Sequence, residues 1–101
     1  MVRITVYKKH FYPELADDFL TDGREVGPCP ILEEGQVYHY DGGAEKPEGL
    51  CPWAWIDIYK QVAALYSGGG NQPWYKESGQ AVACCTDGVR PVIFILERLP
   101  S

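Results

Sequence analysis

The sequence predicts an α+β protein, a single domain over residues 1–101, with a small mixed or antiparallel sheet of about four strands and two helices packed on one face. Three observations lead to this prediction. Apolar and polar residues alternate near both ends of the chain, an apolar helical repeat fills its middle, and Asp87-Gly88 separates two strand-like segments. A length of 101 residues and a hydrophobic fraction of 46% are those of one globular domain with its own core.

The first half of the chain predicts two strands and a short helix. Alternating isoleucine and valine indicate a strand over residues 2–10. A helix follows over residues 13–20, because proline suits the first helical position, where its missing N–H would have no partner. Residues 26–30, "VGPCP", form a stiff extended connection, since proline also restricts the residue before it. Residues 36–40 alternate again and predict the second strand.

The second half of the chain predicts a long helix and two further strands. Pro52 begins the helix, and the run from Ser67 to Gly70 ends it. Residues 80–85 and 89–99 are expected to pair as strands, with Pro91 at an edge or a bulge because proline cannot donate to a ladder. The inward side of the long helix is predicted to carry residues at helical spacing, namely Trp55, Ile58, Tyr59, Val62, Leu65 and Tyr66.

Composition and charge exclude several classes of partner. A net charge of −5 disfavours nucleic-acid binding, which needs clustered lysine and arginine. The sequence has no apolar run of about 18 residues, so it predicts no membrane span, and the N-terminus lacks the apolar centre of a signal peptide. A cytoplasmic location is therefore expected, with a small-molecule substrate and a homodimer as the remaining partners. In a reducing compartment, four cysteines are expected to be thiols, metal ligands or redox groups.

The cysteines are the candidate site residues. Cys51 precedes the long helix, whose positive N-terminal end favours a thiolate. Cys29 lies between two prolines, so a ligand there loses little entropy on binding. Cys84 and Cys85 are consecutive in a predicted strand, and consecutive side chains of a strand point to opposite faces. One of the two is therefore expected to point inward.

The predicted hairpin assigns roles to this vicinal pair. A two-residue turn at Asp87 would put Cys85 opposite Arg90, whose guanidinium favours a thiolate. Cys84 shares its strand parity with Val82, which makes Cys84 the expected inward ligand. Arg90 and Asp87 are expected to form the polar rim of the cofactor site.

These residues lead to three functional hypotheses. In the first, Cys29, Cys51 and either Cys84 or Cys85 bind zinc or an iron–sulfur cluster and leave one coordination position open. In the second, the protein is a non-enzymatic small-ligand-binding or assembly module whose cysteines are structural, as buried free cysteines commonly are. In the third, Cys84 and Cys85 form a redox pair, although a disulfide between neighbours is strained. Whether the protein is an enzyme stays open.

The strings "CPWAW" and "CCTDGVRPV" carry a resemblance, together with "VGPCP" and "EEGQVYHYDGG". The sequence resembles, over nearly its whole length, a family of small conserved hypothetical proteins of about 100 residues from anaerobic bacteria and archaea. This family has no agreed activity, so the resemblance implies no catalytic residues. It implies that the motifs containing the four cysteines characterise the family. An anaerobic background would also suit oxygen-sensitive iron–sulfur chemistry.

Overall fold

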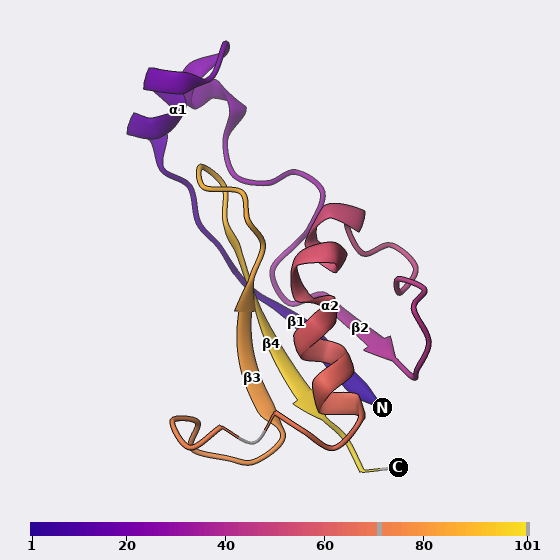
Figure 1. Cartoon of the computed structure of the whole chain (residues 1–101). Coiled ribbons are helices and arrows are strands. Elements are labelled where there is room, and N and C mark those ends of the chain that lie inside the picture. Colours follow the sequence, from indigo (N-terminus) through magenta and orange to yellow (C-terminus); the bar gives the residue numbers. More distant parts are fainter. Residues whose placement is uncertain (71, 101) are drawn as a thin grey trace.

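The protein is one four-stranded antiparallel sheet with two α-helices, and the predicted α+β class is confirmed (Figure 1). The computed structural model describes residues 1–70 and 72–100. The strands lie in the order β2-β1-β4-β3. Along the chain the elements are β1 (Val2–Lys9), α1 (Pro13–Phe19), the 3₁₀ helix η1 (Gly23–Val26), β2 (Val37–Tyr40), α2 (Pro52–Tyr66), β3 (Gln80–Cys84) and β4 (Val92–Arg98).

The core lies between α2 and one face of the sheet. In the two central strands, Ile4 is opposite Leu96 and Val6 is opposite Phe94, and these side chains are buried. The strand alternation in the sequence therefore sends one set of apolar residues to the same face. From α2, the residues buried against that face are Ala54, Trp55, Ile58, Val62 and Leu65.

Two of the residues predicted on the inward side of α2 are not fully buried in the structure. Tyr66 is exposed and Tyr59 is half-buried. Both rings pack edge-on against Tyr40 of β2, with ring centroids 5.3 Å from Tyr66 and 6.3 Å from Tyr59. The two tyrosines thus extend the core at its border through their ring contacts with Tyr40.

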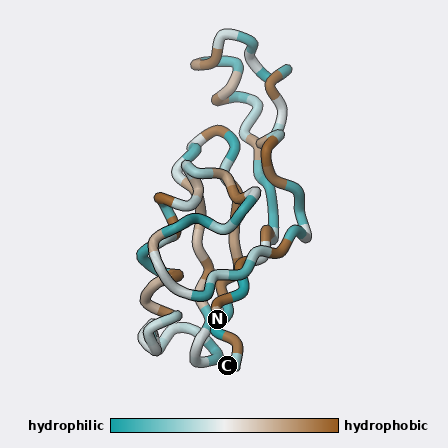
Figure 2. The backbone as a smooth tube through the Cα atoms, turned by 90° about the vertical axis from the view of Figure 1, so that its right-hand side faces the viewer, coloured by the Kyte–Doolittle hydropathy of each residue, from teal (hydrophilic) through white to brown (hydrophobic). Residues whose placement is uncertain are grey.

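Helix α1 does not pack on the sheet face, which corrects the predicted position of the first helix. It packs against η1 beyond the end of the sheet, and the molecule is elongated, 45 × 30 × 20 Å (Figures 1 and 2). The physical reason is that the backbone of β1 continues past its ladder, with His10 N–H donating to Pro91 and Tyr12 N–H to Val89. The helix therefore begins where the sheet has already ended, and Phe19 is 77% exposed.

The connection between β3 and β4 is longer than the predicted two-residue turn. Residues 85–91 form a loop, and the last paired residues are Cys84 and Ile93. Asp87 organises this loop, because its Oδ1 accepts the N–H groups of Val89 and Arg90, both at 2.9 Å. Pro91 lies just before β4, which is a central strand, so the proline is at neither the edge nor the bulge that was predicted; the ladder pairing begins after it, at Val92.

Candidate functional site

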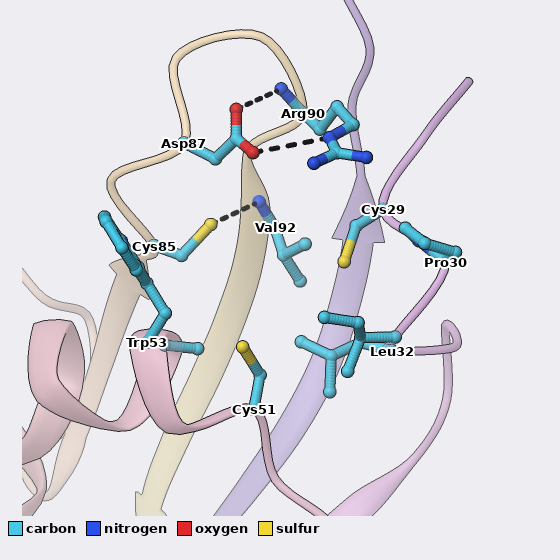
Figure 3. Close-up of a pocket in the computed structure, with 11 residues that line it drawn as sticks. Cys29, Pro30, Leu32, Cys51, Trp53, Cys85, Asp87, Arg90 and Val92 are labelled. Carbon is cyan, nitrogen blue, oxygen red and sulfur yellow. Dashed lines mark hydrogen bonds and ion pairs between the residues drawn. The ribbon is translucent and has the colours of Figure 1, made fainter. Parts of the chain in front are cut away.

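A pocket of about 360 Å³ lies at the end of the sheet where α2 begins (Figure 3). Three segments far apart in the sequence form its walls: the connection after η1, the first turn of α2, and the β3–β4 loop with the start of β4. The lining is mostly apolar, and its polar groups are thiols, one carboxylate and one guanidinium. The lining residues are Cys29, Pro30, Ile31, Leu32, Cys51, Trp53, Ala54, Cys85, Asp87, Arg90 and Val92.

Three of the four cysteines line this pocket. The side chains of Cys29, Cys51 and Cys85 point toward the same space (Figure 3). Each is a free thiol, partly buried, and packed against the core. Cys51 is the N-cap residue of α2, and its carbonyl accepts the first intrahelical bond from Trp55 N–H at 2.9 Å. Helix formation therefore holds the backbone that presents this sulfur.

Cys84 points away from the pocket. The prediction that Cys84 is the inward ligand of the vicinal pair is therefore wrong. Cys84 and Val82 do share one strand face, but that face is exposed, and the buried parity of β3 belongs to Ala81 and Ala83. Although Cys84 is exposed, partial desolvation by the surrounding protein raises the pKa of its thiol, and the nearby Cys85 and Asp57 raise it further. Cys84 therefore remains a neutral thiol at pH values where an ordinary cysteine begins to ionise.

Cys85 lines the pocket because the strand pairing ends at that residue. Its backbone N–H donates to the carbonyl of Val92 at 3.1 Å, and its sulfur accepts the N–H of Val92 at 3.3 Å. The residue opposite Cys85 is therefore Val92 and not Arg90, which corrects the predicted cross-strand pair. The cause is the longer loop, which displaces Arg90 from the ladder.

Asp87 and Arg90 nevertheless lie at the pocket, at its polar side. Arg90 Nε donates to Asp87 Oδ2 at 3.4 Å (Figure 3). Partial burial raises the pKa of Asp87, but the N–H groups of Arg90 and Val89 and the charge of Arg90 outweigh it and hold the pKa below its ordinary value. Asp87 is thus an anion at neutral pH, and it fixes both the loop backbone and the direction of the guanidinium.

A polar contact that the sequence does not reveal ties the pocket loop to α2. Asp57 Oδ2 accepts the backbone N–H of Thr86 at 2.8 Å and its hydroxyl at 3.0 Å. Trp53 Nε1 donates to the same hydroxyl at 2.9 Å. Thr86 lies 29 residues after Asp57, and the spacing of these residues contains no sign that they meet. This network positions Trp53 as a wall of the pocket although its side chain is 67% exposed.

We expect Asp57→Ala to destabilise the protein by about 1–2 kcal/mol, because it removes two bonds to a charged acceptor at a partly exposed site. Urea denaturation would measure the free energy of unfolding. Lys60→Ala is the matched control, since Lys60 is an exposed residue of the same helix. Equal stability of the two variants would show that the contact between Asp57 and Thr86 contributes nothing.

The three pocket thiols surround a space. Among residues 1–70 and 72–100, no group of three or more His, Cys, Asp or Glu side chains is close enough together to hold a metal ion. A tetrahedral zinc ion needs sulfur atoms about 4 Å apart, because each Zn–S bond is about 2.3 Å.

Within residues 1–70 and 72–100, no helix has the length and apolar character needed to cross a membrane.

Comparison with known proteins identifies no relative of this chain. No protein-family model, no curated protein and no solved structure matches the chain. The resemblance drawn from "CPWAW" and "CCTDGVRPV" therefore stays an expectation, and the function has to be argued from the pocket itself.

Proposed function

We propose that this is a small cytoplasmic protein whose pocket binds an iron–sulfur cluster or a metal ion through Cys29, Cys51 and Cys85. The observation that carries the proposal is the meeting of these three free thiols, from three separate chain segments, in one pocket. Sulfur ligands select zinc, copper(I) and iron–sulfur clusters among the biological metals.

We favour a cluster over a single ion, because no group of the described residues could hold a single ion. A single ion needs all its ligands around one point, and no described group of residues has that arrangement. In a cluster each thiolate binds a different iron, so its ligands stand around a space. A cavity of about 360 Å³ supplies such a space. The N–H of Val92 on the Cys85 sulfur is also of the kind that tunes the reduction potential of clusters.

Three thiolates would leave one iron of a four-iron cluster without a protein sulfur. That position would be open to water or to a small substrate, as in catalytic metal sites that keep one coordination position free. The polar side of the pocket, formed by Asp87 and Arg90, would then border the open position.

Anaerobic purification, followed by iron, zinc and acid-labile sulfide analysis and a visible spectrum, tests the proposal. We expect iron and sulfide in equal amounts and absorbance in the visible range. Cys29→Ser and Cys51→Ser should lose both the bound iron and this absorbance. Cys84→Ser is the matched control, because Cys84 lies outside the pocket lining. A folded protein that takes up neither iron nor zinc after anaerobic reconstitution contradicts the proposal.

A second function is supported by the apolar walls of the same pocket. Leu32 is almost completely buried beneath it, and Ile31, Val92 and Trp53 complete a lining typical of small-molecule sites. In this alternative the thiols are packing groups, and the protein is a small-ligand-binding module. A metal-free protein that stays folded with all four cysteines replaced would favour it. The homodimer expected from the open sheet edge stays a prediction as well.

A further inference from the structure

We propose that the pocket accepts a small carboxylate with an apolar body, and that Arg90 binds its carboxylate group. This inference rests on the pocket of the proposed function and names its ligand class, but it does not depend on a bound metal. Three properties of the pocket support this inference: the orientation of Arg90, the hydrogen bonds that Asp87 already accepts, and the apolar walls opposite these two residues.

Arg90 is held at the pocket by one edge of its guanidinium. Nε donates to Asp87 Oδ2, and the side chain is only 32% exposed. Within the described residues, its two terminal nitrogens donate to no protein group, and they lie on the side of the pocket that also contains Cys29 (Figure 3). A guanidinium with its terminal N–H groups available matches the two oxygens of a carboxylate, which it binds with two parallel hydrogen bonds.

Asp87 does not cancel this preference, because its oxygens already have partners. Oδ1 accepts two backbone N–H groups and Oδ2 accepts Arg90 Nε. These bonds fix the loop backbone and the direction of the guanidinium, so Asp87 acts as a positioning residue. Arg90 is the one cationic side chain among the residues that line the pocket. An anionic ligand would therefore find its cationic partner in the pocket at Arg90.

The walls define the rest of the ligand. Leu32 is 1% exposed and forms the floor, and Ile31 and Trp53 are exposed at the sides of the pocket. A volume of about 360 Å³ suits a molecule of several carbon atoms. Covering exposed apolar surface with an apolar ligand is favourable, because it removes that surface from water. An acid with a short alkyl or aryl group would thus satisfy the guanidinium and the walls together.

Binding of charged and neutral isosteres to the metal-free protein tests the inference. Reduced, chelator-treated protein would be titrated with butanoate and phenylacetate, and with butanamide and phenylacetamide, by calorimetry and by ¹H–¹⁵N NMR. Each amide has the shape of its acid without the charge. We expect the acids to bind at least about tenfold more tightly, because a carboxylate forms charge-assisted bonds to arginine. Shifts in the NMR spectrum should include Cys85, Arg90 and Val92.

Variants assign the effect to Arg90. Arg90→Gln should lose the preference for acids over amides, whereas Arg24→Gln should keep it, because Arg24 lies in η1 and pairs with Asp17. Arg90→Lys, which keeps the charge but not the two-pronged geometry, should retain part of the preference and guards against a folding defect in the glutamine variant. Equal affinity for acid and amide, no binding of either acid, or an unchanged preference in Arg90→Gln would overturn the inference.

The outcome is separable from that of the metal proposal. Acid binding is measured without metal. If the protein binds acids through Arg90 but takes up no iron, only the cluster proposal fails. If the protein takes up iron but binds acids and amides equally, only the proposed ligand class fails.

Discussion

A Cys85→Ser protein is expected to bind at least about tenfold less iron or zinc than a Cys84→Ser protein, because removal of a ligand costs more than the loss of an outer-shell contact. The two positions are neighbours in the sequence and carry the same side chain. The sulfur of Cys85 lines the pocket, whereas that of Cys84 is exposed and donates to the carbonyl of Cys85 at 3.1 Å. Metal content after anaerobic reconstitution, normalised to folded protein, measures the difference.

The design of this pair makes the result easy to interpret. Both substitutions replace sulfur by oxygen at one site each, so non-specific effects of losing a thiol are shared by the two variants. Circular dichroism would establish that both remain folded. Equal metal content would show that Cys85 is no ligand. Greater loss in Cys84→Ser would require the strand to expose its opposite face and would contradict the arrangement of β3.

Phe94→Ala is expected to lower the free energy of unfolding by about 3–5 kcal/mol, because it leaves a cavity among residues that cannot fully close around it. Phe94 is completely buried in β4, between Val6 of β1 and Ala83 of β3. A domain of this size is stable by about 5–15 kcal/mol, so the loss is a large part of the total. Urea denaturation followed by circular dichroism measures it.

Ile93→Ala is the matched control in the same strand. Ile93 is adjacent in sequence but lies on the opposite face of the sheet, where it is half-buried. Its truncation removes less contact, so its cost should be clearly smaller than that of Phe94→Ala. The reverse order would mean that the face opposite α2 is the better packed side of the sheet.

Most helices and strands of this protein follow from local patterns in its sequence, although β4 begins at Val92 instead of residue 89 and the 3₁₀ helix η1 was not predicted. The start of α2 at Pro52 and its end at Tyr66 agree with the helical apolar repeat and the glycine run after it. The strands β1 and β2 begin and end within one residue of the alternating segments. Such patterns are readable because side-chain direction repeats with the period of each element.

The position of α1 was not readable in this way. Leu15 and Phe19 have the spacing of an inward face, but both are exposed because the helix starts beyond the sheet. A short apolar pattern states which side of a helix could be buried, and it contains no information on whether a surface lies opposite. That surface depends on how far β1 runs along the β3–β4 loop.

The cysteines show the same division between local and long-range causes. Alternation along a strand requires that Cys84 and Cys85 face opposite ways, and this much is a property of the chain alone. Which of them faces the pocket depends on the face of β3 that α2 covers and on where pairing with β4 ends. The contact between Asp57 and Thr86 and the meeting of Cys29, Cys51 and Cys85 likewise join residues distant in the chain. Local periodicity decides which side chains share a face, and packing between distant segments decides what that face meets.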